Sequence, residues 1–280
     1  SATNFYYNLD KNKYIVEMFD FPKQRNDFLI KYSEFDLVIP LIHWIWWENW
    51  ELTNFCNTVW KKYLFSDAES HMLCINKYLS SLFLESYSYL IPKIFLVTNM
   101  QDLEKIKCDF KIFVKPCNWG SSVDNGVFNN LWEAKSLIEK ILKYDEVLIQ
   151  EYIKKQREFT VSIIWDYDKN PEILAISEII TDKELFDYEA KYEAKWAQEI
   201  INAQNLWEIE DEIKKISLEI YKKFKVKTFS RIDFIYSNEK LYFLEVNTIP
   251  WFTKMSFLPQ SIISKWYKIS DFLDEIIKNT

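Results

Sequence analysis

Glycine is nearly absent from this sequence. The chain has 2 glycines among 280 residues, whereas average usage of about 7% would give roughly 20. A mixed α/β protein normally needs glycine for turns, helix ends and loops that approach phosphates. The chain also has 12 tryptophans. Other residues must therefore stand at positions where glycine is the usual choice.

Further shortages exclude whole classes of protein. A net charge of −7 argues against a nucleic-acid partner. No run approaches the ~18 apolar residues that would span a membrane, and residues 1–14 do not resemble a signal peptide. With 2 histidines, a histidine-based metal site is not expected. The four cysteines lack metal-type spacing and indicate reduced thiols of a cytoplasmic protein: they are Cys56, Cys74, Cys108 and Cys117.

Acidic and amide residues interrupt a predicted β-hairpin near the C-terminus. Arg231–Tyr236 and Leu241–Val246 are rich in β-branched and aromatic residues and flank a turn-like SNEK. Asp233, Glu245 and Asn247 occupy positions where a buried strand should be apolar, and the last two point to one face. Three oxygen donors on one face suit a hard cation such as Mg²⁺ or Mn²⁺ and the phosphates it carries. Surface salt bridges are the alternative interpretation.

A shared cation also predicts the register of this hairpin. A two-residue loop at Asn238-Glu239 would pair Asp233 with Leu244 and send Glu245 to the opposite face. An odd loop, most simply Asn238-Glu239-Lys240, would place Asp233 opposite Glu245. The chemistry therefore favours the odd loop.

A series of motifs extends this segment over most of the chain. In chain order they are L-I-H-W-I-W-W-E-N-W (41–50), V-K-P-C-N-W-G-S-S-V (114–123), V-L-I-Q-E-Y-I (147–153), R-E-F-T-V (157–161), F-D-Y-E-A-K-Y (186–192), R-I-D-F (231–234), L-E-V-N-T-I-P-W-F-T (244–253) and S-F-L-P (256–259). This ordered series resembles the D-alanine–D-alanine ligases of the ATP-grasp superfamily. The resemblance implies an α/β (α+β) ATP-grasp fold, with an N-terminal α/β unit at 1–65, a central subdomain at 66–150 and a C-terminal subdomain at 151–280 that carries the metal and substrate site.

The resemblance also implies an activity. ATP would phosphorylate the carboxylate of one D-alanine, and the amine of a second would attack the acyl phosphate to give a dipeptide for peptidoglycan synthesis. The partners would be ATP, Mg²⁺ or Mn²⁺, and D-alanine, with no nucleic acid and no membrane. A homodimer is compatible with the resemblance, although the residues themselves say nothing about assembly.

Site residues follow by matching motif positions. The residues expected to bind nucleotide are Lys77, Lys115, Ser121, Ser122, Glu151, Tyr152, Ile153, Glu158 and Lys191. Those expected to bind metal are Asp233, Glu245 and Asn247. Those expected to contact substrate are His43, Glu48, Ser256 and Phe257. Catalytic roles are expected for Arg231, Ser121, Tyr192 and Lys191.

Some positions depart from the family pattern. Asn76 stands where the family has aspartate, and Asp124 replaces the usual glycine, adding negative charge beside the expected phosphates. The chain also begins after the family's first strand and glycine-rich turn, so we expect it to be N-terminally truncated. Two alternatives stay open. One is an ATP-grasp ligase with a different amine or hydroxy acid, and the other is a non-catalytic nucleotide-binding protein.

Periodicity and the resemblance together predict the elements. Helices are expected over 1–10, 51–63, 66–84, 131–143, 209–224 and 271–278. Strands are expected over 14–19, 36–42, 110–115, 147–153, 159–164 and 172–179, in addition to the hairpin.

The tryptophans offer an account of the missing glycines. On family glycine positions lie Trp44, Trp46, Trp47, Trp50 and Trp251. At predicted turns or helix ends lie Trp60, Trp165, Trp196, Trp207 and Trp266. We hypothesise that the source organism reads UGA as glycine and that the sequence was translated with UGA as tryptophan. Trp119 and Trp132 have no such account, and a tryptophan-rich lineage is the alternative. The hypothesis predicts glycine at position 251 of the native protein, because the backbone must turn sharply there and glycine admits a positive φ or the close approach of a ligand. Mass spectrometry that found tryptophan at this position would refute it.

Overall fold

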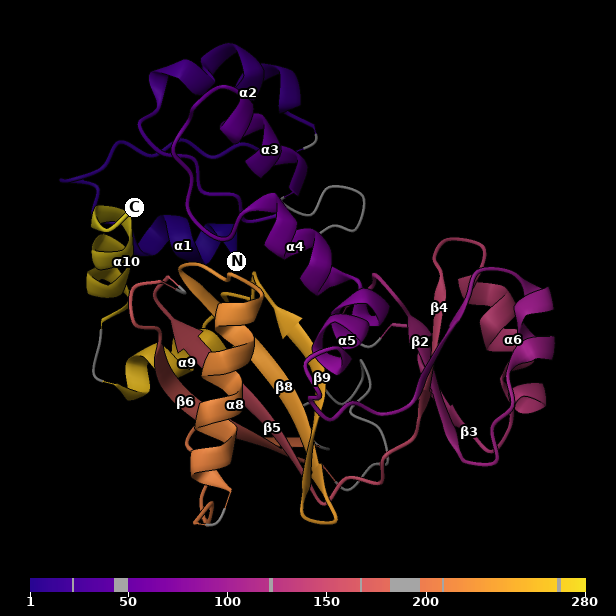
Figure 1. The fold of residues 1–280 in the computed structure, drawn as a ribbon. Helices are drawn as coiled ribbons and strands as arrows, with labels where there is room; N and C mark the ends of the chain where they lie inside the picture. Colours follow the sequence, from indigo (N-terminus) through magenta and orange to yellow (C-terminus); the bar gives the residue numbers. More distant parts are fainter. Residues whose placement is uncertain are drawn as a thin grey trace.

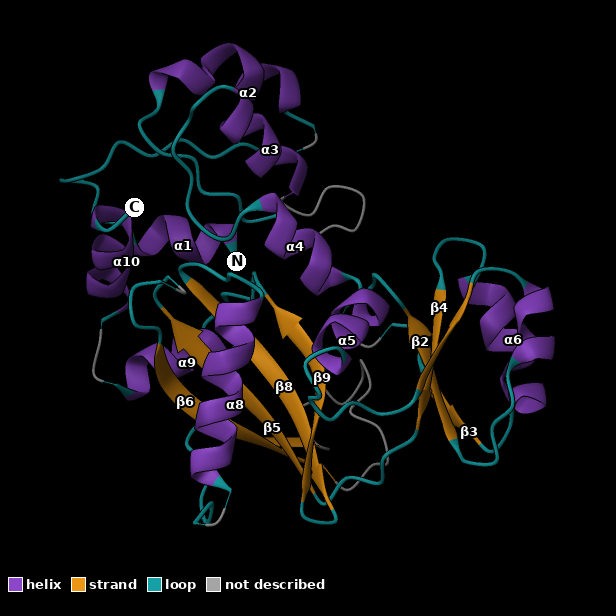
Figure 2. Ribbon diagram, in the orientation of Figure 1, coloured by secondary structure: helices purple, strands orange, loops and turns teal. Residues whose placement is uncertain are grey.

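Two antiparallel sheets organise the molecule (Figure 1). The structure is a computed structural model and describes residues 1–21, 23–42, 50–120, 123–166, 168–181, 197–207, 209–265 and 268–280. Helices, strands and connecting loops are distinguished in Figure 2. The expected mixed α/β class is confirmed. Among the described residues, no helix is long and apolar enough to cross a membrane.

The smaller sheet has four strands in the order β1-β4-β2-β3. The strands are β1 (Ile94–Val97), β2 (Ile112–Pro116), β3 (Gly126–Phe128) and β4 (Val147–Glu151). Helix α6 (Leu131–Ile141) packs against this sheet and closes an apolar core with it. The side chain of Asn130 caps this helix by accepting the Glu133 N–H at 3.0 Å. The short η2 (Met100–Lys105) links β1 to β2.

The larger sheet has five strands in the order β7-β6-β5-β8-β9. The strands are β5 (Arg157–Ile164), β6 (Glu172–Thr181), β7 (Ala197–Ile200), β8 (Phe229–Ser237) and β9 (Lys240–Asn247). The predicted antiparallel pairing of β5 with β6 is confirmed. The predicted hairpin is also present, as β8 and β9.

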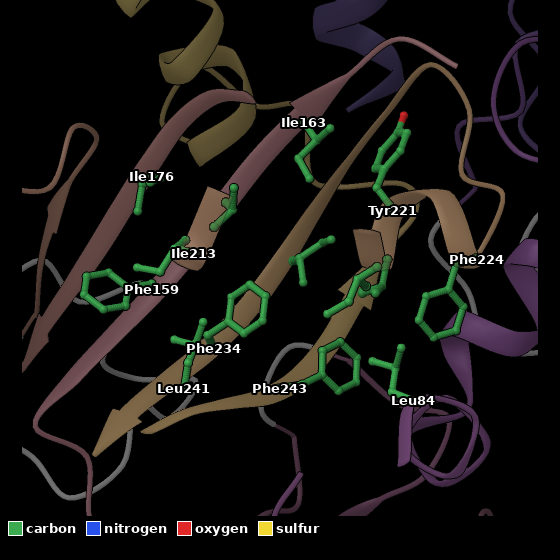
Figure 3. Packing of buried hydrophobic residues seen from close by; sticks show 14 of the residues in the cluster. Leu84, Phe159, Ile163, Ile176, Ile213, Tyr221, Phe224, Phe234, Leu241 and Phe243 are labelled. Carbon is green, nitrogen blue, oxygen red and sulfur yellow. The ribbon is translucent and has the colours of Figure 1, made fainter. Parts of the chain in front are cut away.

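The two faces of the larger sheet differ in character. Helix α8 (Glu210–Lys223) covers an apolar face to which β5 contributes Phe159, Val161 and Ile163. Phe234 of β8 and Phe243 of β9 lie in the same core (Figure 3). The alternate residues of β5 and β8 point to the other face, where α9 (Phe257–Ser264) packs. That second face carries the polar side chains of the site.

The hairpin has the predicted register, but a β-bulge produces it instead of an odd-numbered loop. Asp233 pairs with Glu245, while the loop has two residues because Ser237 pairs with Lys240. A β-bulge at Leu244 restores the register between Asp233 and Phe234. The prediction of an odd loop is therefore wrong. The bulge lets Phe243 face the apolar core while Glu245 faces the site, which an unbulged strand cannot do.

The predicted helix over 66–84 is interrupted. It forms α4 (Ala68–Ile75) and α5 (Lys77–Glu85), with extended backbone at Asn76. The Asn76 side chain accepts the Leu79 N–H at 2.9 Å and so begins the second helix. The break sets Lys77 at a helix N-terminus.

The two N-terminal strands are not formed. Residues 14–19 are irregular, and residues 36–42 contribute one isolated bridge, between Val38 and Tyr63. Without a ladder of partners, an apolar run cannot form a strand. This part of the chain instead contains α1 (Ala2–Asn8), α2 (Arg25–Lys31), η1 (Tyr32–Glu34) and α3 (Trp50–Thr58). The remaining predicted helix is present as α10 (Ile269–Lys278), which contacts α1.

Candidate active site

Two carboxylates and an amide meet on the polar face of the larger sheet. Asp233 of β8 lies opposite Glu245 of β9, and Asn247 follows two residues later on the same face. The Asn247 Nδ2 lies 3.2 Å from Asp233 Oδ2 and 3.3 Å from Glu245 Oε1. The three metal ligands predicted from sequence are therefore brought together, with the amide bridging the acidic pair.

Arg231 and Thr160 fix the orientation of Asp233. Arg231 Nε and Nη2 donate to the two oxygens of Asp233 at 3.0 and 3.1 Å. Burial opposes the charge of Arg231, but Asp233 and Glu245 raise its pKa overall. Thr160, which pairs with Asp233 across the strands, donates its hydroxyl to Asp233 Oδ1. Sequence reasoning missed Thr160. Its hydroxyl faces the site because Thr160 alternates with core residues along β5.

Lys77 reaches the acidic pair from the facing helix. Its Nζ lies 3.5 Å from Glu245 Oε2 and donates to the Trp119 carbonyl at 2.9 Å. The backbone N–H of Lys77 donates to the Cys117 carbonyl at 3.0 Å. The lysine thus connects the loop that follows β2 with the end of the larger sheet. Its side chain is buried, which is unusual for a lysine on a helix and leaves its charge facing Glu245.

Lys115 lies in the same electrostatic environment. It projects from β2, and burial together with the charge of Lys77 lowers its pKa to about 8, against the opposing charges of Glu245 and Asp233. Lys77 at the start of α5 and Lys115 on β2 therefore both interact electrostatically with the carboxylates of the larger sheet. A polyanion bound beside them would relieve the repulsion between the lysines.

Both departures from the family pattern are accommodated locally. Asn76 performs the helix-capping role that an aspartate performs equally well. Asp124 has a φ of 52°, and its carboxylate accepts hydrogen bonds from Lys140 at 2.6 Å and Tyr144 at 2.8 Å. Because Lys140 and Tyr144 engage the Asp124 carboxylate, its charge does not oppose phosphate binding as strongly as expected.

The predicted adenine segment lies where β4 leaves the smaller sheet. The N–H groups of Glu151 and Tyr152 donate to the carbonyls of Lys93 and Lys111 at 2.7 and 2.8 Å. Within the described chain, no hydrogen bond donated by the Ile153 N–H is found, so it is free for a ligand. Glu158, on the site face of β5, accepts a hydrogen bond from Lys155 at 2.7 Å.

The substrate-side residues begin α9. Ser256 is the residue before this helix, and its Oγ lies 2.7 Å from Thr253 Oγ1. Phe257 is buried, and the Arg231 guanidinium lies 5.7 Å from the centre of its ring. The start of α9 therefore lies near Arg231. The remaining predicted site residues lie outside the described residues: they are His43, Glu48, Ser121, Ser122, Lys191 and Tyr192.

The donor set suits a divalent cation with phosphates. Hard cations prefer carboxylate and amide oxygens, and Mg²⁺ is usually held by one or two carboxylates together with substrate phosphates. Within the described part of the chain, no group of three or more His, Cys, Asp or Glu side chains is placed to hold a metal. The Asn247 amide donors point into the space between the acidic pair, where a cation's positive charge would lie.

Comparisons with known proteins identify the family of the chain. The family described as "D-ala D-ala ligase C-terminus" matches residues 86–278. A D-alanine–D-alanine ligase of Fervidobacterium nodosum is 34% identical over 272 residues, covering 90% of this chain and 85% of its own length. D-alanine–D-alanine ligase B of Clostridium perfringens is 31% identical, covering 100% and 92%.

The fold is also similar to that of solved ligases. The crystal structure of D-alanine–D-alanine ligase from Bacillus anthracis complexed with ATP matches with a TM-score of 0.82 and 26% identity, covering 99% of this chain and 89% of that one. Such ligases have the ATP-grasp fold, which confirms the predicted fold class. With the family match spanning most of the chain and relatives above 30% identity over nearly all of it, the chain belongs to the D-alanine–D-alanine ligase family.

Proposed function

We propose that the chain catalyses the ATP-dependent joining of two D-alanines, as its relatives' names indicate for them. The observation that carries this proposal is the opposition of Lys77 and Lys115 to the acidic pair between two sheets. Cationic groups facing carboxylates in one space are the parts that phosphoryl transfer requires. The product would serve peptidoglycan synthesis, as in the family.

The first step transfers the γ-phosphoryl group of ATP to a D-alanine carboxylate. We assign Lys77 and Lys115 to the phosphates, because Lys77 forms an ion pair with Glu245 and the charge of Glu245 acts on Lys115. The N–H of Ile153 would hold the adenine, and Glu158 the ribose hydroxyls after exchanging its bond with Lys155. Ser121, Ser122 and Lys191 stay predicted phosphate contacts.

Asp233, Glu245 and Asn247 would hold Mg²⁺ or Mn²⁺. When bound, such a cation neutralises phosphate oxygens and orients them for in-line transfer. For the Asn247 side chain to be a ligand, its amide must turn so that the oxygen replaces the nitrogen between the carboxylates. Thr160 and Arg231 hold Asp233 in place meanwhile.

The second step joins the amine of another D-alanine to the acyl phosphate. The neutral amine forms the carbon–nitrogen bond and the carbonyl oxygen becomes negative. The nitrogen then gives up a proton, and phosphate leaves with the electrons of the carbon–oxygen bond and the proton as the carbonyl is restored. Arg231 would stabilise the negative oxygen, since it is only partly exposed and the carboxylates beside it raise its pKa. Ser256 and the start of α9 would hold the second carboxylate. His43, Glu48 and Tyr192 stay predicted substrate contacts.

Phosphate release in the presence and absence of D-alanine tests the proposal. We expect ATP- and D-alanine-dependent release, and dipeptide in equal amount. Glu245→Gln should lower the rate by about 100-fold or more, as expected for loss of one preorganised charge. Glu239→Gln is the matched control, because Glu239 is exposed in the turn of the same hairpin. Release without D-alanine, or equal rates for both variants, would contradict the assignment.

Two further assignments are proposals of the same kind. We propose that residues 1–65, 66–150 and 151–280 act as separate units around the nucleotide. This division is supported by the two sheets falling within the second and third ranges, at 94–151 and 157–247. We also propose a cytoplasmic location, which is consistent with the four unpaired cysteines.

A further inference from the structure

A buried histidine contacts the turn that follows the metal-ligand strand. His71 lies on α4, is 4% exposed, and its Nδ1 lies 2.7 Å from Thr248 Oγ1. Its Nε2 is buried without a hydrogen-bond partner. Burial lowers the pKa of His71 to about 4, although the charge of Asp67 opposes this effect. The ring is therefore neutral at pH 7, and its side-chain hydrogen bond among the described residues goes to Thr248, which is not one of the groups assigned to ATP or D-alanine.

Thr248 lies just outside the β8–β9 ladder, so no strand pairing restrains it. The β8–β9 ladder ends at the pair Arg231 and Asn247, so Thr248 is the first residue beyond it. Because Asn247 belongs to the last pair of the ladder, a displacement of Thr248 would loosen the strand end that presents the Asn247 amide to the acidic pair. The bond to His71 is the side-chain restraint found at this point among the described residues.

Two of the polar contacts in the described part of the chain connect the α4–α5 segment with β9 and the residue that follows it. One is the ion pair between Lys77 and Glu245 at 3.5 Å, and the other is His71 with Thr248. By the proposed function, Lys77 and Glu245 exchange their contact for phosphate and metal when nucleotide binds. The His71–Thr248 bond involves no ligand-binding group, so it can persist through that exchange.

We infer that His71 is a positioning residue that keeps the Asn247 end of β9 aligned with Lys77 while nucleotide and metal bind. This inference rests on the proposed function, because it assumes that Asn247 and Lys77 act on one metal-bound nucleotide. His71 acts through Thr248 and does not itself touch the reacting atoms. Its loss should therefore weaken metal binding more than nucleotide binding without metal.

Four variants separate this role from ordinary core packing. His71→Leu and Thr248→Val remove one partner each with little change of shape. His71→Asn places an amide atom near the position of Nδ1, and Thr248→Ser keeps the hydroxyl. If His71 only fills space in the core, Mn²⁺ affinity should depend on the volume of the side chain at this position. If His71 positions Thr248, the affinity should depend on whether the hydrogen bond can form. If the leucine variant fails to fold, the two Thr248 variants carry the test.

Mn²⁺ binding to the full chain with ADP is the readout, measured by electron paramagnetic resonance. Disruption of outer contacts around metal ligands typically costs 10–100-fold in affinity, and we expect about 10-fold for His71→Leu and for Thr248→Val. His71→Asn and Thr248→Ser should stay close to the wild-type affinity. The double variant should bind no more weakly than either single one, because both remove the same bond. ADP affinity without metal should stay unchanged in all of them.

The outcomes are distinguishable from a failure of the proposed function. Equal Mn²⁺ affinity in the wild type, His71→Leu and Thr248→Val would overturn the inference, even if the variants were less stable. Absence of Mn²⁺ binding in the wild type would overturn it as well, because no metal site would exist to position. Wild-type Mn²⁺ binding that His71→Leu and Thr248→Val weaken, in a chain without D-alanine-dependent phosphate release, would support the inference and reject the ligase activity.

Discussion

Replacing Trp60 by glycine should stabilise the protein. Trp60 has a φ of 55° just after α3 and is 94% exposed. Its N–H donates to the Asn57 carbonyl at 3.2 Å, and the next N–H, of Lys61, donates to the Cys56 carbonyl at 2.8 Å. These two bonds form a Schellman motif, in which the residue at the position of Trp60 is usually glycine.

The expected gain follows from two opposing effects. An L-residue in the left-handed region costs about 1–2 kcal/mol, which glycine avoids. Glycine in turn loses more backbone entropy on folding, by roughly 0.5–1 kcal/mol. Because the indole is almost fully exposed, its removal sacrifices little packing. We therefore expect the free energy of unfolding to rise by about 1 kcal/mol, and the melting temperature by about 2 °C for a chain of this size.

Trp60→Ala is the matched control, because it removes the same exposed indole and keeps the Cβ that makes a positive φ costly. Its free energy of unfolding should lie near that of the wild type and about 1 kcal/mol below that of Trp60→Gly. Trp132→Gly is a second control, for which we expect the free energy of unfolding to fall instead of rise. Trp132 is the second residue of α6 and is 83% exposed, so glycine there should cost about 0.5 kcal/mol through helix propensity.

Urea unfolding at pH 7 measures these differences, with the slope of the transition checked for constancy. If Trp60→Gly is no more stable than Trp60→Ala, the backbone argument fails. Equal stabilisation by Trp60→Gly and Trp132→Gly would show that removing any exposed tryptophan helps, whatever its φ.

Two predictions concern pH. The low pKa of Lys115 means that its charge is lost above about pH 8, so kcat/KM for ATP should fall above that pH, and Lys115→Arg should remove this decline. For His71, the pKa falls from 6.5 to about 4 on folding, so the unfolded chain takes up a proton first, and stability is lost as pH falls from 6.5 towards 4. Between pH 7 and 5 the wild type should lose about 2 kcal/mol more than His71→Asn in urea unfolding. Equal losses would show that His71 does not carry this pH dependence.

Two features of the sequence made part of the site predictable: the alternation of strand residues between the two faces of a sheet, and the order of the motifs along the chain. Asp233 and Glu245 interrupt apolar strands, and a shared ligand required them to be paired, as they are. The bulge that achieves this pairing was missed, although the sequence contains a signal for it. The buried residues change phase along β9 from Leu241 and Phe243 to Val246, which is the mark of one inserted residue.

Other features depend on contacts between elements that are distant in the sequence, and these cannot be predicted from one strand or helix alone. The Asn76 break was missed because asparagine within a helical pattern is tolerated, and here capping of the second helix prevailed. Thr160 was missed because its role depends on the register between β5 and β8. The two N-terminal strands were predicted from apolar runs alone, and the described chain offers them no ladder.

The backbone separates the tryptophans more sharply than motif matching did. Trp251, on a family glycine position, does not have a positive φ, so the close approach of a ligand is the reason for glycine that applies at this position. Trp60 and Trp165 do have one, at 55° and 73°, whereas Trp50, Trp207 and both glycines of the chain do not. Five further tryptophans assigned to glycine positions lie outside the described residues: Trp44, Trp46, Trp47, Trp196 and Trp266. A bulky residue with positive φ is a rare outlier, and two among the tryptophans favour the hypothesis that some are translated as glycine in the source organism.

This hypothesis makes a position-specific prediction for the protein isolated from its source. Peptide mass spectrometry should find glycine at 60 and 165, where the backbone is left-handed. Position 132 should be tryptophan, because glycine in the first turn of α6 would weaken that helix. A tryptophan-rich lineage would instead show tryptophan at all three positions, and the positive φ values would then be strain that the fold tolerates. Glycine at 132 together with tryptophan at 60 would contradict the link between backbone geometry and residue identity on which the hypothesis depends.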